Sequence, residues 1–175
     1  MATPSSVHKT VLITGASSGI GKALAYHFAG DGYELVLAAR SVARMQALAD
    51  ELMRQFKVTV TVIDADLETH EGAARLHGEI KARGLVLSAL VNNAGYGAFG
   101  EFKDSALANE LAMMQLNMTT VVTLTKLFLP DLLATRGKIL NLASTAAFQP
   151  GPYMAVYYAT KAFVLSFSEA IASEL

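Results

Sequence analysis

Short apolar segments alternate with longer amphipathic segments along the whole of this chain. The short segments are rich in β-branched and aliphatic residues, which is typical of strands, and they occupy residues 10–14, 33–40, 58–64, 86–95 and 137–144. The longer segments have helical spacing and occupy residues 21–31, 43–55, 70–83, 105–133 and 156–175. Strands that alternate with helices form successive βαβ units with right-handed crossovers. The sequence therefore predicts an α/β fold, a Rossmann-like doubly wound parallel sheet with helices on both faces.

The length and composition are those of one well-packed domain. The chain has 175 residues, of which 53% are hydrophobic and 17% are charged, and no low-complexity segment or linker divides it. We therefore expect a single domain over residues 1–175. The formal net charge is −1 and no segment is polybasic, which argues against a nucleic-acid partner.

Further function classes are disfavoured by what the sequence lacks. It has no cysteine and its four histidines are scattered, so we expect no metal site. Its apolar runs are shorter than the roughly 18 residues of a membrane helix. The first ten residues lack the apolar region of a signal peptide. We therefore expect a cytoplasmic protein with no membrane partner.

A glycine-rich segment, TGASSGIG, joins the first predicted strand to the first predicted helix at residues 14–21. Gly15 can end the strand in a tight turn, Gly19 leaves room for a phosphate beside backbone N–H groups, and Gly21 lets the helix pack closely on the sheet. The spacing GxxxGxG differs from the GxGxxG fingerprint of dinucleotide sites. The segment predicts a pyrophosphate site, and an ordinary strand-to-helix turn is the alternative.

The residue after the second strand indicates which dinucleotide would bind. A carboxylate there would accept a hydrogen bond from the ribose 2′-hydroxyl and favour NAD, but this sequence has Ala39 and Arg40. A guanidinium can bind a 2′-phosphate through two parallel hydrogen bonds. The sequence therefore favours NADP, unless Arg40 is only a solvated residue at a helix start.

Polar residues also follow the later strands, at the edge where such sheets bind ligands. After the third strand, Asp66 or its competitor Asp64 could accept from the adenine amino group, or either could be a turn or N-cap residue. The segment NNAG follows the fourth strand, and Ser144 closes the fifth. Asn117 lies inside a predicted helix, where asparagine is unfavourable and is most often a surface residue.

Together with the segment YYATK at residues 157–161, these features resemble the short-chain dehydrogenase/reductase family in its NADP-preferring branch. The resemblance runs from about residue 9 to residue 175. It implies the strand order 3-2-1-4-5, continued by strands 6 and 7, and an enzyme that interconverts a carbonyl and a secondary alcohol with NADP(H). The catalytic residues that it implies are Asn117, Ser144, Tyr157 and Lys161. The cofactor-binding residues that it implies are Gly15, Ser17, Ser18, Gly19, Ile20, Gly21, Arg40, Asp66, Leu67, Asn93, Ala94, Gly95, Tyr157 and Lys161.

The resemblance also gives each catalytic residue a role. Tyr157 would be the general acid or base, and Lys161, one helical turn later, would lower its pKa and bind the nicotinamide ribose. Ser144 would polarise the carbonyl by a hydrogen bond that strengthens as negative charge develops. Asn117 would belong to the proton relay, through a water molecule that links Lys161 to solvent. Tyr158 is offset by about 100° on the helix and is expected to pack or to face another subunit.

Several expectations concern size, substrate and partners. Members of the family are usually longer, so we expect a C-terminally truncated form in which the last strands are missing and the fifth strand is an exposed edge. A small-molecule substrate, a carbonyl compound or an alcohol, is expected, and Tyr96 and Phe99 could give its pocket an apolar lining or could be anchored in the core. A homodimer or homotetramer is expected. The alternatives are a non-catalytic nucleotide-binding or redox-sensing protein of the same fold, and an inactive fragment of an enzyme.

Overall fold

Five parallel strands form one sheet in the computed structural model of the chain, which describes residues 9–175. The strands are β1 Thr10–Thr14, β2 Glu34–Ala39, β3 Val60–Asp64, β4 Ala89–Asn92 and β5 Lys138–Asn141. Their order is β3-β2-β1-β4-β5, and every neighbouring pair is parallel. The predicted α/β Rossmann-like fold and its strand order are confirmed. The expectation of no signal peptide falls mainly on residues 1–8, outside the described residues.

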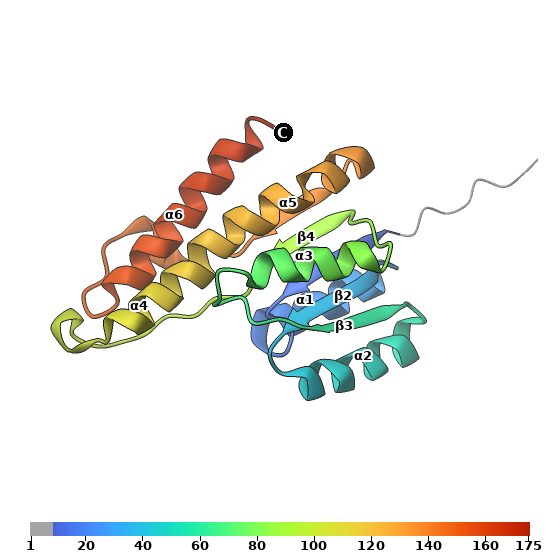
Figure 1. Cartoon of the computed structure of the whole chain (residues 1–175), viewed down its shortest axis with the longest axis horizontal. Helices are drawn as coiled ribbons and strands as arrows, with labels where there is room; N and C mark the ends of the chain where they lie inside the picture. Colours follow the sequence, from blue (N-terminus) through green and yellow to red (C-terminus); the bar gives the residue numbers. More distant parts are fainter. Residues whose placement is uncertain (1–8) are drawn as a thin grey trace, which may run out of the picture.

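Helices cover both faces of this sheet (Figure 1). They are α1 Gly19–Gly30, α2 Val42–Phe56, α3 Gly72–Ala82, α4 Leu107–Met114, α5 Thr120–Thr135 and α6 Ala155–Ala172. Successive side chains of a strand point to opposite faces. In β1, Leu12 therefore joins a core cluster with α3 and α5, whereas Val11 and Ile13 join a second cluster with α1 and α2. Among the described helices, none is long and apolar enough to cross a bilayer.

The strands differ in how well they are covered. All residues of β1 and β4 are buried, as expected for strands in the middle of a sheet with helices on both faces. Strand β5 alternates exposed and half-buried residues, and within residues 9–175 it pairs with β4 alone. Its Leu140 is 42% exposed. No sixth or seventh strand occurs in the described part of the chain, so the outer edge of β5 is uncovered there.

The helix predicted over residues 105–133 is not uniform. It consists of α4, a π-helical turn at Gln115–Thr119, and α5. A π-helical turn contains one additional residue and so rotates the next part of the helix about its axis, and such turns are frequent at functional sites. Here the turn carries Asn117, which is only 1% exposed. The view of Asn117 as a surface residue is therefore wrong.

Candidate functional site

A cleft of about 890 Å³ lies at the carboxyl ends of the strands. Its volume is within the range of about 300–1,000 Å³ that is typical of ligand sites. The segments that come after β1 to β5 and the helix α6 all contribute to its walls. The lining includes thirteen of the residues predicted to act in catalysis or to bind the cofactor: Gly15, Ser17, Ser18, Gly19, Ile20, Arg40, Asp66, Leu67, Asn93, Ala94, Gly95, Tyr157 and Lys161. Gly21, Asn117 and Ser144 do not line it.

The glycine-rich turn leaves both space and hydrogen-bond donors at one side of the cleft. Gly15 has a φ of +66°, which turns the chain sharply after β1, and its N–H donates to Ala38 O of β2 at 2.8 Å. Gly19, with a φ of +55°, has no atom from beyond its chain neighbours and the backbone of its own helix within 4 Å of the position where a Cβ would stand. The Ser18 side chain makes no capping hydrogen bond to α1. Because the first N–H groups of a helix have no partner inside the helix, this turn suits a phosphate group.

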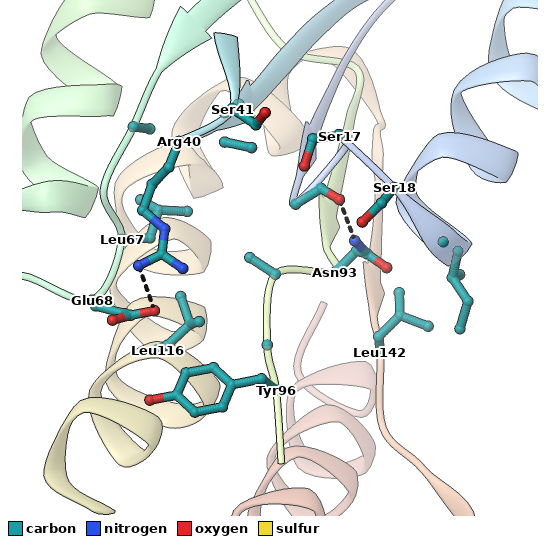
Figure 2. Close-up of a pocket in the computed structure, with 18 of the residues that line it drawn as sticks. Ser17, Ser18, Arg40, Ser41, Leu67, Glu68, Asn93, Tyr96, Leu116 and Leu142 are labelled. Carbon is teal, nitrogen blue, oxygen red and sulfur yellow. Dashed lines mark hydrogen bonds and ion pairs between the residues drawn. The ribbon is translucent and has the colours of Figure 1, made fainter. Parts of the chain in front are cut away.

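Thr14 and Asn93 join the glycine-rich turn to the loop after β4. The Thr14 hydroxyl donates to Val91 O at 3.2 Å and accepts from the N–H groups of Asn93 and Ala94, both at 3.0 Å. The Asn93 amide donates to Thr14 O at 2.8 Å and to Gly15 O at 3.2 Å, so it lies between the two loops (Figure 2). Thr14 was not predicted as a site residue, and its place at the end of β1 is the signal that could have found it.

Two guanidinium groups line the far end of the cleft, beside the loop after β2. The Nη1 atom of Arg40 forms an ion pair with Oε1 of Glu68 at 3.0 Å, and Ser41 lies next to it (Figure 2). Arg44, in the first turn of α2, also lines the cleft. Sequence reasoning missed both Arg44 and Glu68. The spacing of Arg44 four residues after Arg40 was a signal for the first of them.

Asp66 takes part in a turn at the same end. Its Oδ1 accepts from the backbone N–H of Glu68 at 3.1 Å, which is the Asx turn considered as its alternative role. The side chain is nevertheless exposed and lines the cleft. Asp64, the competing candidate, is the last residue of β3 and does not line the cleft.

Lys161 is buried beside Tyr157 at the other end. Its ammonium group donates to Leu142 O at 2.7 Å and lies 5.9 Å from the centre of the Tyr157 ring. Lys161 is only 7% exposed, and this burial lowers its pKa below the ordinary value of 10.5. The two residues are one turn apart on α6 and share a face of that helix.

Asn117 holds the loop that covers Tyr157. Its Oδ1 accepts from Tyr96 N–H at 3.2 Å, and its Nδ2 donates to Tyr96 O at 2.9 Å and to Thr160 Oγ1 at 3.0 Å. Thr160 in turn donates to Tyr157 O at 2.7 Å. A Cβ at Gly95 would lie 2.8 Å from Asn117 Oδ1 and 3.6 Å from Lys161 Nζ, so only glycine fits between them. Thr160 was not singled out from the sequence.

Ser144 lies beyond the end of the fifth strand. Strand β5 ends at Asn141, three residues before Ser144, so the expectation that Ser144 closes the strand is wrong. Ser144 is the N-cap of a short 3₁₀ helix, Thr145–Phe148, and its hydroxyl accepts from the N–H of Ala146 at 3.1 Å. This segment packs against α6, the helix that carries Tyr157.

A second cavity of about 400 Å³ lies on the other side of Tyr157. Its rim includes Phe99 and Tyr153, whose ring centres are 5.6 Å apart, and the exposed side chain of Phe102. Phe99 is 79% exposed and is not anchored in the core. Tyr96 lines the first cleft instead, where burial and then the Glu68 carboxylate raise the pKa of its phenol. Within residues 9–175, Tyr157 alone lines both cavities.

The side chain of Tyr158, the residue after Tyr157, lines neither of these two cavities. Its ring meets the ring of Tyr157 edge-on at 6.1 Å between centres and lies directly over Gly151, where no Cβ would fit. The offset expected from the helical geometry therefore places Tyr158 in local packing. Of the two adjacent tyrosines, Tyr157 is the one that lines the cleft.

Comparison with known proteins gives consistent results. The model of the short chain dehydrogenase family matches residues 9–175. The 11-beta-hydroxysteroid dehydrogenase-like 4A of Arabidopsis thaliana is 37% identical over 168 residues, which cover 95% of this chain and 56% of that protein. The chain thus spans about half the length of this curated relative.

Solved structures agree in fold. A short-chain dehydrogenase from Sphingobium yanoikuyae in complex with NADPH has a TM-score of 0.88 and 38% identity, covering 95% of this chain and 65% of that one. The bulky-bulky ketone specific alcohol dehydrogenase from Comamonas testosteroni has a TM-score of 0.89 and 38% identity, covering 95% of this chain and 67% of that one. With its sheet order, its glycine-rich turn and the match over residues 9–175, the chain belongs to the short-chain dehydrogenase family.

Proposed function

We propose that the protein is an NADP(H)-dependent oxidoreductase that interconverts a bulky, apolar carbonyl compound and the corresponding secondary alcohol. The observation that carries this proposal is the position of Tyr157 in the wall shared by the two cavities. One cavity has the size and the donors for a dinucleotide, and the other has an aromatic rim. A phenol between them can exchange a proton with a substrate that lies against the cofactor.

The residues of the first cleft fit NADP. Arg40 and Arg44 would bind the 2′-phosphate, the turn from Gly15 to Ile20 would bind the pyrophosphate, and Lys161 would bind the nicotinamide ribose. The bound cofactor supplies or accepts the hydride. The NADPH complex of the Sphingobium yanoikuyae relative supports this assignment.

The chain's own residues would handle the proton. Tyr157 would donate its phenolic proton to the carbonyl oxygen as negative charge develops there, and the Lys161 ammonium nearby would favour the resulting phenolate. Ser144 lines neither cavity, but its hydroxyl accepts from Ala146 N–H and so keeps its own hydrogen free to donate to a substrate oxygen. Asn117 Oδ1 and Lys161 Nζ both face Gly95, which supports a relay that returns a proton to Tyr157.

The second cavity favours a large apolar substrate. Its rim of Phe99, Phe102 and Tyr153 offers exposed aromatic surface, and ligand pockets are lined mainly by hydrophobic and aromatic side chains. Relatives named for hydroxysteroids and for bulky ketones support the same choice. The cytoplasmic location and the homo-oligomer expected from the sequence stay predictions.

A substrate screen tests this function. The purified chain is mixed with NADPH or NADH and with bulky apolar ketones, small aldehydes or acyl thioesters, and loss of the reduced-cofactor absorbance is followed. We expect turnover with NADPH, fastest with bulky apolar ketones. Binding of NADPH is measured separately by calorimetry. NADPH binding without turnover of any carbonyl would contradict the proposal and favour the non-catalytic alternative.

A further inference from the structure

An ion pair crosses the adenosine end of the cleft. Arg40 and Glu68 belong to different loops, after β2 and β3, and both side chains line the cleft (Figure 2). Their charged atoms are 3.0 Å apart. The guanidinium that the proposed function assigns to the 2′-phosphate is therefore already bound to a carboxylate of the protein.

The carboxylate is the better fixed partner of this pair. The Glu68 side chain is 25% exposed, against 62% for Arg40. The backbone of Glu68 is held by the Asx turn with Asp66, and the preceding residue, Leu67, is buried with its O accepting from Thr120 Oγ1 at 2.8 Å. This turn therefore anchors the backbone of Glu68 to the core, whereas the Arg40 side chain is the more exposed partner of the pair.

We propose that Glu68 is a specificity-determining residue of the cofactor site, whose carboxylate competes with the 2′-phosphate for Arg40. The inference rests on the proposed function. Two guanidinium groups, Arg40 and Arg44, and two carboxylates, Asp66 and Glu68, line this end of the cleft, so their formal charges cancel. A 2′-phosphate must displace Glu68 from Arg40 and then remain near its negative charge. The 2′-hydroxyl of NADH meets no such repulsion and can donate to a carboxylate.

The variant Glu68→Gln separates the charge of this residue from its shape. The Asx turn uses the backbone N–H of Glu68, so the substitution leaves that turn intact. Ion pairs with this degree of exposure contribute little, so we expect the Kd for NADPH to fall by about threefold to fivefold. The Kd for NADH should stay the same or rise. Both constants are measured by calorimetric titration of the same protein preparations.

Two controls make the result specific. Glu79→Gln removes the same charge from an exposed pair with Arg83 on α3, outside the cleft, and should change neither Kd. In an Arg40→Ala background, Glu68→Gln should lose most of its effect on NADPH, because Glu68 acts mainly through Arg40. Unchanged or weaker NADPH binding in Glu68→Gln would overturn the inference while the proposed function stands. A wild-type chain that binds neither dinucleotide would overturn both.

Discussion

The ammonium group of Lys161 is buried and has one backbone acceptor, Leu142 O. Burial lowers its pKa, so the unfolded chain binds this proton more strongly than the folded chain does. Between the lowered pKa and the ordinary value of 10.5, the free energy of unfolding therefore rises with pH. Below the lowered pKa, Lys161 is charged in the folded and the unfolded chain, so the full free-energy cost of burying its charge reduces the stability of the folded chain.

This dependence can be isolated by comparison with Lys161→Met. Both proteins are unfolded with urea at a series of pH values, from neutral pH up to the ordinary lysine pKa of 10.5. Each pair of curves gives the difference between their free energies of unfolding. We expect the wild-type chain to gain stability relative to the variant as the pH rises. A difference that stays constant over the whole range would show that burial does not disfavour the charged form.

Thr160 links two of the proposed catalytic residues. Its hydroxyl accepts from the Asn117 amide and donates to Tyr157 O, and the side chain is buried. Thr160→Val keeps the shape but removes both bonds, so we expect a loss of about 1–3 kcal/mol in the free energy of unfolding. Thr160→Ser keeps the hydroxyl and should lose clearly less. Urea unfolding measures both losses, and a loss in Thr160→Ser as large as that in Thr160→Val would contradict the prediction, because the methyl group would then contribute as much as the hydroxyl.

The site residues divide by how they could be found from the sequence. Tyr157 and Lys161 were predictable because their residue types and their spacing on a helix carry the chemistry. Thr160 and Glu68 were not, because each acts through a side chain whose proximity only the fold creates. Glu68 lies 28 positions from its partner Arg40 and Thr160 lies 43 from Asn117, beyond the reach of local patterns.

At the scale of the elements, the strands and most helices lie close to their predicted positions because apolar spacing and glycine punctuation mark their limits. The π-helical turn at Gln115–Thr119 is the exception. One additional residue in a helical turn changes the spacing too little for the sequence of a long apolar helix to reveal it. The buried position of Asn117 depends on this turn, and could not be predicted for the same reason.

Helix α5 anchors one face of the sheet and offers a test of the core. Phe128 is fully buried and meets the ring of His77 edge-on at 4.9 Å between centres. Phe128→Ala should reduce the free energy of unfolding by about 3–5 kcal/mol through lost burial and a cavity. Leu133→Ala, on the same helix but 57% exposed, should change it by less than about 0.5 kcal/mol. Similar losses in the two variants would contradict the assignment of the buried face.

At the scale of the whole molecule, the sheet should not be equally stable across its width. Strand β1 is buried and has neighbours on both sides, whereas β5 is partly exposed and pairs with β4 alone within the described residues. Amides with few buried contacts open more readily. Hydrogen exchange followed by mass spectrometry should therefore show faster exchange in peptides from β5 than in peptides from β1. Equal protection of the two strands would indicate that the outer edge of β5 is covered.

The whole-molecule arrangement was predictable only in part. The alternation of strands and helices predicts the parallel sheet and the edge at which ligands bind. It does not predict that two cavities meet at Tyr157, because much of the lining of the second cavity comes from residues 98–106 and 153–154, which have no periodic pattern and lie outside the α-helices and strands. Tyr153 even adopts a φ of +64°, which its residue type does not suggest.

The central claim is that Tyr157 transfers the proton while the rest of the cleft holds the cofactor. The most direct measurement is the rate of carbonyl reduction by Tyr157→Phe, together with its Kd for NADPH. We expect the rate to fall by at least about 10²–10⁴-fold, because the phenolic proton is gone. The Kd should stay within a few-fold of the wild-type value, because the residues that line the rest of the cleft are unchanged. A Tyr157→Phe variant that reduces carbonyls at the wild-type rate would contradict the claim.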